Sequence, residues 1–476
     1  LLEEVLAREP EEVRAFLLQT AILTRLSGPL CDAVTDASGS QEMLERLEKH
    51  NLFVVPLDDD RRWYRYHHLF ADLLLARLYQ SGPDAVARLL SRAAEWCERD
   101  GQVADAVGYA LTAKDYCKAA SLIARHWGPT VNDGEVEVVW SWLHALPEDV
   151  VRNSGPLGVA YCWVLWLKGQ IGEIEPHLVD AESALSEQGV PEGAGADDEG
   201  YAVVPSLIAA MRSIVARYHE DFYAASAHAE RALGLVPGDL PPLADAQLRG
   251  VISLALAAAY GGAGDLEKAA GACAEAIRWS RQGKNTSGLA GATYWMVGML
   301  RILGRLRQAD EACRAALRFV EARGLAHLPA AGVLHVVMGE VLLERNDLES
   351  AEYHLARGAK LGRWSGRLDA VRNAAPALAR LRLARQDADG ALSAVREMEA
   401  AQGEPPAPLA RAELLALKAR VLVREGSLGE AAQCVEEAIR LAGRDRGQTG
   451  EAVALAASRV HLAQCRPGAA VAHLTQ

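Results

Sequence analysis

The spacing of hydrophobic and polar positions changes at about residue 80. Before it, "VRAFLLQTAIL" has apolar residues at helical spacing, and "GPLCDAV" and "QEMLERLEKH" predict two further short helices. The segment "LFVVPLDDDRRWYRY" offers two β-rich runs around an acidic turn, which predicts a β-hairpin, and a helix follows from about His68. Three helices, a hairpin and a helix predict a small winged-helix-like module over residues 1–80.

Beyond residue 80 the strand signals stop and the sequence repeats itself. "GDLEKAAGACAEAI" at 264–277 returns as "GRLRQADEACRAAL" at 304, "NDLESAEYHLARGA" at 346, "QDADGALSAVREME" at 386 and "GSLGEAAQCVEEAI" at 426, in steps of 40, 42, 40 and 40 residues. In each copy one helical pattern ends at a turn and a second begins at once. Because one helical pair cannot bury its own apolar face, the period predicts stacked pairs.

Two positions of each repeat indicate how the pairs pack. The small residue after each turn predicts a close helix crossing: Ala269, Ala309, Ala351, Ala391 and Ala431. Apolar positions further on predict contact with the neighbouring unit: Cys273, Cys313, Leu355, Val395 and Val435. We therefore expect an all-α protein, with irregular helical repeats and a linker over residues 81–200. A right-handed superhelix of helical hairpins, similar to tetratricopeptide repeats (TPR) with a period of about 40, is predicted over residues 201–476.

Composition and charge narrow the functions to consider. The formal net charge of −13 argues against the chain holding a nucleic-acid backbone by itself. The eight cysteines are scattered without a CxxC pair, which predicts small core residues in a reducing compartment and no metal site. No signal peptide or membrane span is visible, so the sequence predicts a cytoplasmic protein. The chain begins inside a helical pattern without methionine, which indicates a fragment.

Several segments together resemble one family. "FLLQTAILTRLSGPLCDAV", "LERLEKHNLFVVPLDDDRRWYRYHHLFADLLLARL", "AAEWCERDG" and "WLHALPEDVV" are similar to the MalT-like family of large, ATP-dependent LuxR-type transcriptional regulators. The resemblance implies an ATPase, a winged helix, a superhelix and a C-terminal helix-turn-helix, with ATP and an inducer favouring an oligomer. No G-x-x-x-x-G-K-[ST] motif occurs in this sequence, so ATP or ADP is implied only for the full-length protein.

The family implies the roles of this chain. We expect it to be no enzyme but an effector-sensing and oligomerisation region, which binds a small-molecule inducer or a regulatory protein and self-associates on activation. DNA would be bound only by a helix-turn-helix outside the sequence, and no membrane is involved. The alternative is a stand-alone TPR-like scaffold for protein–protein interaction.

The histidine pair in "YHHL" is the candidate nucleotide contact. It resembles the methionine–histidine–aspartate motif of related signalling ATPases, in which the histidine reaches the β-phosphate of ADP. The resemblance implies this role for His67 in the intact protein, with His68 in place of the aspartate. The alternative is that both histidines cap and pack the start of the helix.

Aromatic residues supply the candidate ligand contacts. Those in the regular repeats are expected to line the concave groove of the superhelix: Trp279, Tyr294, Trp295 and Trp364. A second group either stacks on a sugar or packs in a core: Trp140, Trp142, Trp163 and Trp166. In the hairpin, Arg61, Arg62 and Arg65 either contact DNA or point outward opposite inward-facing aromatic residues.

Overall fold

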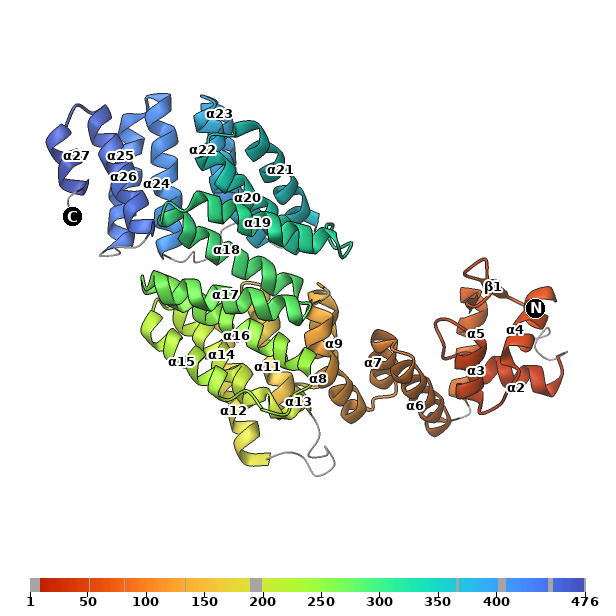
Figure 1. The fold of residues 1–476 in the computed structure, drawn as a ribbon. Coiled ribbons are helices and arrows are strands. Elements are labelled where there is room, and N and C mark those ends of the chain that lie inside the picture. Colours follow the sequence, from red (N-terminus) through yellow and green to blue (C-terminus); the bar gives the residue numbers. More distant parts are fainter. Residues whose placement is uncertain are drawn as a thin grey trace. The chain divides into compact units, whose positions relative to one another are not determined.

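The computed structural model describes residues 9–50, 52–80, 82–132, 134–188, 199–364, 368–400, 408–443 and 448–474. The chain divides into two compact units. Figure 1 labels their elements and colours them in sequence order. Unit 1 comprises Leu1–Val164 with Val179–Ala196, and unit 2 comprises Leu165–Leu178 with Asp197–Gln476. Across the described ranges the only sheet is one two-stranded hairpin, and the other regular elements are helices.

Unit 1 begins with the module predicted from the sequence. Its elements are α2 (Glu11–Thr20), α3 (Gly28–Thr35), α4 (Ser40–Lys49), β1 (Val54–Pro56), β2 (Tyr64–Tyr66) and α5 (His68–Tyr79). Strands β1 and β2 are antiparallel, with Val55 opposite Arg65. Leu26 joins the edge of β2, because its N–H donates to the Tyr64 carbonyl and its carbonyl accepts from the Tyr64 N–H, both at 2.8 Å. The order of three helices, a hairpin and a helix is confirmed.

Alternation along β2 separates its two faces. Tyr64 and Tyr66 are buried while Arg65 is exposed, and the Tyr66 hydroxyl lies 2.7 Å from Thr20 Oγ1. The turn before β2 is held by the Asp58 carboxylate, which accepts from the N–H groups of residues 62 and 63. The arrangement of inward aromatic and outward arginine side chains is therefore the one that an ordinary hairpin requires.

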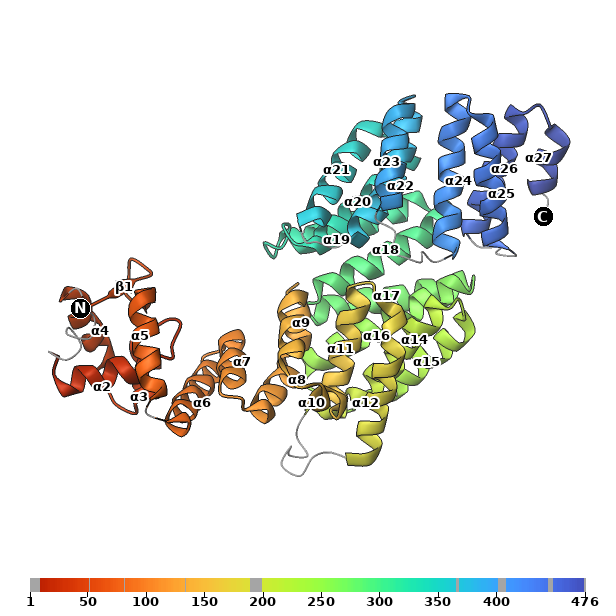
Figure 2. The same cartoon turned by 180° about the vertical axis from the view of Figure 1, so that it is seen from behind.

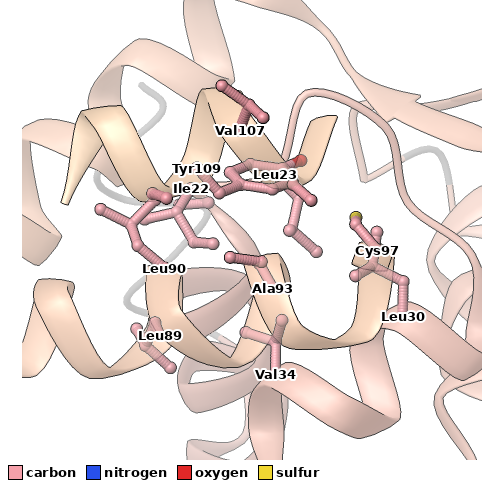
Figure 3. Packing of buried hydrophobic residues seen from close by; sticks show 14 of the residues in the cluster. Ile22, Leu23, Leu30, Val34, Leu89, Leu90, Ala93, Cys97, Val107 and Tyr109 are labelled. Carbon is pink, nitrogen blue, oxygen red and sulfur yellow. The ribbon is translucent and has the colours of Figure 1, made fainter. Parts of the chain in front are cut away.

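The remaining helices of unit 1 extend the same core. They are α6 (Pro83–Arg99), α7 (Val103–Thr112), α8 (Tyr116–Asn132), α9 (Val136–Ala145) and α10 (Glu148–Arg152). Figure 3 shows Val34 of α3 near Ala93 of α6 and Leu30 of α3 near Cys97 of α6, with Leu90 near Ile22. The buried cluster is thus continuous across residue 80. The division between the units passes through α11 (Gly155–Leu167) and α12 (Ile174–Gln188), which flank the 3-10 helix η1 (Ile171–Glu173).

Unit 2 is a series of paired helices. They are α13 (Glu199–Ala202), α14 (Val204–Tyr218), α15 (Phe222–Gly234), α16 (Pro242–Gly262), α17 (Leu266–Gln282), α18 (Thr286–Ile302), α19 (Leu306–Glu321), α20 (Pro329–Glu344), α21 (Leu348–Trp364), α22 (Leu368–Ala384), α23 (Ala388–Ala400), α24 (Pro408–Glu425), α25 (Leu428–Ala442), α26 (Gln448–Ala463) and α27 (Pro467–Leu474).

From α14 onward each even-numbered helix packs against the next helix of its own pair and also against the next even-numbered helix. We call α14, α16, α18, α20, α22, α24 and α26 the inner helices. Figure 2 shows α24, α25, α26 and α27 following one another as such a stack. The predicted TPR-like solenoid is confirmed.

The turn within each pair explains the repeat in the sequence. Its first residue has the left-handed backbone that lets a helix end sharply: Glu220, Gly264, Gly304, Asn346, Gln386, Gly426 and Cys465. In several pairs the next residue caps the second helix, as where Asp265 Oδ1 accepts from the Lys268 N–H at 3.2 Å. One residue stops a helix and the next starts another, so the pair closes without a loop.

Small residues allow the helices of a pair to approach closely. The five alanines predicted at the crossings are all fully buried. In the α20–α21 pair glycines bring the backbones closer still. A Cβ built on Gly358 would lie 2.8 Å from the Gly332 carbonyl oxygen, and one on Gly339 would lie 2.6 Å from Leu355 Cγ.

Three cysteines correct the prediction that all eight lie in the core. Cys117 and Cys465 are exposed and Cys434 is half-buried, whereas the other five are buried. Cys465 occupies a turn between helices, where its side chain has no neighbouring layer to pack against. Among the described residues no helix is both long and apolar enough to cross a membrane, and no group of three potential metal ligands comes together.

Candidate functional site: a charged groove along the inner helices

A cavity of about 650 Å³ lies along the inner helices of unit 2. Inner helices α16, α18, α20, α22, α24 and α26 all contribute to its walls. Met398 from α23, Gly264 from the turn before α17 and Leu266, the first residue of α17, complete them. We call this cavity the groove. Its size falls in the range of about 300–1,000 Å³ that is usual for small-molecule sites.

One repeat position supplies a charged side chain from five successive inner helices. Counted along the sequence, these residues follow one another in steps of 39 or 40 and all line the groove: Arg301, Glu340, Arg380, Arg420 and Arg459. Equivalent positions on stacked helical pairs point the same way, so the period of the repeat lines these charges up.

Arg301 joins two inner helices through an ion-pair network. Its guanidinium on α18 lies 2.6 Å from the Glu340 carboxylate and 2.5 Å from that of Glu344, both on α20. The Arg301 side chain is 10% exposed, so water screens these contacts little. Burial raises the pKa of Glu340, and the positive charges of Arg301 and Arg380 partly offset this rise. Arg380 also reaches Glu344, at 3.4 Å.

Arg420 contrasts with Arg301. Its Nε is buried and makes no hydrogen bond to any described residue. Burial, together with the positive charges of Arg459 and Arg380, lowers the pKa of Arg420 to about 10. Glu413 lies seven residues, about two turns, earlier on α24 and lines the same groove. Its side chain is exposed to solvent, and no ion pair joins it to Arg420 among the described residues.

The groove also carries aromatic side chains. Tyr294 and Trp295 on α18 both line it, and their rings meet edge to face with centroids 5.8 Å apart. A Cβ on Gly261 would lie 3.6 Å from the indole of Trp295, so the absence of a side chain there leaves the ring room. Burial raises the pKa of the Tyr294 hydroxyl. Two of the four aromatic residues expected in the groove are therefore placed there.

The other two expected aromatic residues have different surroundings. Trp279 is not among the residues that line the groove, because it lies on α17, the second helix of its pair. Its ring lies 4.0 Å from the guanidinium of Arg278 and 5.8 Å from that of Arg249. The side chain of Trp364 lies outside the described residues.

The tryptophans nearer the N-terminus favour the packing interpretation. Trp142 and Trp163 are each 6% exposed, and the Trp163 ring lies 6.0 Å from that of Trp127. Trp140 packs partly buried against the unit 1 core, with its ring 3.8 Å from the His144 ring. The rings of Trp142 and Trp163 are thus not free to stack on a sugar, whereas Trp140 and Trp166 are half-buried.

His67 occupies the junction of the hairpin and α5. Its N–H donates to the Phe53 carbonyl at 2.7 Å, and its own carbonyl accepts from the N–H groups of Phe70 and Ala71. The backbone, not the imidazole, caps the helix. The rings of His67 and His68 are exposed and lie 4.4 Å apart. The imidazole of His67 is thus available to a partner, as the predicted phosphate contact requires.

Two family models match this chain. That of the MalT winged helix domain matches residues 2–86, and that of the MalT-like TPR region matches residues 207–415. Residues 2–86 thus form a MalT winged helix domain, and residues 207–415 form a MalT-like TPR region. The resemblance to MalT-like regulators that the sequence indicated is confirmed.

Curated relatives match part of the chain. The serine/threonine-protein kinase PknK of Mycobacterium tuberculosis is 31% identical over 209 residues, which are 44% of this chain and 19% of that protein. The HTH-type transcriptional regulator MalT of Yersinia enterocolitica is 30% identical over 191 residues, 40% of this chain and 21% of that protein. The matched part thus spans about a fifth of the length of these relatives.

Two solved structures share the fold. One is a signal transduction ATPase with numerous domains and a tetratricopeptide repeat sensor from Pyrococcus horikoshii, with a TM-score of 0.56 at 11% identity. The match covers 99% of this chain and 63% of that one. The other is a Rap protein complexed with Competence and Sporulation Factor, with a TM-score of 0.53 at 12% identity over 75% of this chain and 96% of that one.

The arginines of the MalT-like TPR region and of the helices after it were missed by sequence reasoning. Arg420 and Arg459 lie beyond the last residue matched by the TPR model. A signal for them does exist, because stacking the repeats at a step of about 40 residues brings the arginines into one column. Only the structure, however, separates the paired Arg301 from the unpaired Arg420.

Proposed function

We propose that this chain is the effector-sensing and oligomerisation region of a MalT-like, LuxR-type transcriptional regulator of the cytoplasm. An inducer or a regulatory protein binds in the groove of the superhelix. The observation that carries this proposal is the convergence of charged and aromatic side chains from separate inner helices on one cavity of small-molecule size. The Rap protein of similar fold, complexed with its own factor, supports a role in binding.

A ligand in the groove acts on the shape of the superhelix. Each helical pair contacts mainly its neighbours, so the curvature of a solenoid follows from small rotations between successive pairs. A ligand that bridges α18 and α26 favours one curvature over another. The equilibrium moves only as far as the ligand's affinities for the two shapes differ.

The winged helix passes this change to a nucleotide-binding module elsewhere in the full-length protein. In this proposal the exposed imidazole of His67 donates a hydrogen bond to the β-phosphate of ADP and so holds the resting state. Effector and ATP together favour self-association, and DNA is bound by a helix-turn-helix outside this sequence. For the full-length protein we expect His67→Ala to weaken ADP binding, and an unchanged affinity would remove this role.

The groove is tested by a thermal-shift screen of sugars, small metabolites and candidate proteins on this chain. An effector at 100 times its dissociation constant stabilises the protein by about 2.7 kcal/mol. We expect this shift to be lost in Trp295→Ala. It should persist in Tyr223→Ala, whose side chain on α15 is 87% exposed and outside the groove lining. An effector that stabilises Trp295→Ala equally well would place its site elsewhere.

Sedimentation of the full-length protein, which measures its oligomeric state, distinguishes this regulator from the alternative of a stand-alone scaffold. A regulator of this class self-associates when ATP and effector are present together. A scaffold recruits its protein partner without any dependence on nucleotide.

A further inference from the structure

A second, smaller cavity adjoins the groove at the end of unit 2. It measures about 470 Å³ and shares Arg380, Arg420 and Arg459 with the groove, to which it adds Arg424. The rest of its lining is apolar: Leu383, Ala384, Val423 and Leu462. No acidic side chain is among its lining residues. We call it the arginine pocket.

Arg380 and Arg459 lie close enough to Arg420 for their positive charges to repel its own. Among the described residues, Arg420 and Arg459 have no ion pair, and Arg380 has only the longer contact to Glu344 at 3.4 Å. Arg301 holds the same repeat position two pairs before Arg380 and is neutralised by two carboxylates. The same fold therefore supplies carboxylate partners for one guanidinium of the column and none for Arg420.

A buried hydrogen-bond donor without an acceptor destabilises a folded protein. Such a donor is explained when a bound ligand supplies the missing acceptor. A guanidinium offers donors in a planar fork that fits a phosphate or a carboxylate. Several such forks facing one cavity define a site for a group with two or more oxygen atoms and a negative charge. The apolar walls suit the carbon skeleton that carries this group.

We propose that Arg380, Arg420 and Arg459 bind a phosphate or carboxylate group of a small-molecule effector. This rests on the proposed function of the groove and adds the chemical class of its ligand. The arginine pocket is of small-molecule size, and the net charge of −13 over the whole chain disfavours an extended polyanion. A ligand with its anion here extends along the shared wall into the groove towards Trp295.

The test is calorimetric titration of the 476-residue chain with three probes at constant ionic strength: inorganic pyrophosphate, citrate and the neutral trisaccharide raffinose. We expect saturable binding of pyrophosphate or citrate, and which of them binds more tightly separates a phosphate from a carboxylate ligand. Arg420→Gln and Arg459→Gln should weaken this binding about tenfold or more. Arg411→Gln is the matched control, because Arg411 is on the same helix but exposed and paired with Glu437 at 3.0 Å.

Thermal unfolding of the same variants gives a second readout. Without a probe Arg420→Gln should unfold no earlier than the wild type, because it removes a cation that its neighbours repel. With pyrophosphate or citrate the wild type and Arg411→Gln should gain stability, and Arg420→Gln should not. Absence of saturable binding by both anions would overturn the proposal, as would equal binding by Arg420→Gln and the wild type.

These outcomes are distinct from the failure of the proposed function. If raffinose or another neutral compound binds and Trp295→Ala abolishes that binding while neither anion binds, the groove function stands and the arginine pocket fails. If an anion binds through Arg420 but leaves nucleotide affinity and self-association of the full-length protein unchanged, the anion site stands and the regulatory function fails.

Discussion

Gly358→Ala tests whether glycine sets the spacing of α20 and α21. The added Cβ would lie 2.6 Å from Val336 Cγ2, 2.8 Å from the Gly332 carbonyl oxygen and 3.0 Å from the Val336 nitrogen. Two of these three neighbours are backbone atoms, so rotation of a side chain cannot relieve the clash and the helices must separate. Overpacking of this kind costs about 1–3 kcal/mol.

Helix propensity opposes this cost. Alanine is favoured over glycine within a helix by up to about 1 kcal/mol. The net expectation for Gly358→Ala is therefore a loss of about 1–2 kcal/mol. The control is Gly271→Ala in α17, where a Cβ meets nothing within 4 Å, so the propensity gain stands alone.

The assay is differential scanning calorimetry of the whole chain, with both variants compared with the wild type at one scan rate. We expect Gly358→Ala to lower the Tm by about 2–4 °C and Gly271→Ala to raise it by about 1–2 °C. Opposite signs are the informative result, because the two substitutions are chemically identical. If Gly358→Ala were as stable as Gly271→Ala, close packing at this crossing would not limit stability.

Two further predictions concern charges in unit 2. Arg301→Gln leaves Glu340 buried without its nearest cation, so we expect a loss of stability of about 3 kcal/mol or more at pH 7. The loss should be smaller at lower pH, because the raised pKa of Glu340 favours its neutral form as the pH falls. Urea unfolding at pH 7 and pH 5 measures this, and an equal loss at both pH values would contradict it. His335 is 4% exposed, its Nδ1 lies 2.8 Å from His354 Nδ1, and burial lowers its pKa to about 4 from 6.5. Because protonation is harder in the folded state, the wild type should lose stability as the pH falls from about 6.5 to 4, whereas the Tm of His335→Gln should change less over that range. Parallel Tm curves for the two proteins would show that this histidine does not carry the acid sensitivity.

The fold was predictable because it depends on local signals that recur. The left-handed turn residue, the capping aspartate after it and the buried alanine are neighbours in the sequence. One copy of the repeat therefore already determines where its first helix ends, where its second begins and where the two cross. The alternation of Tyr64, Arg65 and Tyr66 similarly determines which face of the hairpin is buried. By contrast, the glycine contacts between α20 and α21 depend on the distance between the two helices. The spacing of residues along a single helix does not predict that distance.

The candidate site was predictable only in part. Tyr294 and Trp295 were identified as groove residues because aromatic side chains on a repeat array are rare and visible. Trp279 is also an aromatic residue of the repeats, but it lies on the second helix of its pair. The presence of an aromatic residue does not by itself show which helix of a pair faces the groove. The difference between Arg301 and Arg420 depends on which carboxylates the neighbouring inner helices bring near, and that is a property of the stacked structure.

The central claim is that effector binding in the groove changes the affinity of the full-length protein for ADP. The most direct test is to measure that affinity with and without effector. In the full-length protein the dissociation constant of ADP should be measured with and without saturating effector, in the wild type and in Trp295→Ala. The account predicts that the effector weakens ADP binding in the wild type by a factor of about 5–150 and leaves it unchanged in the variant. An ADP affinity that the effector does not alter in the wild type would contradict it.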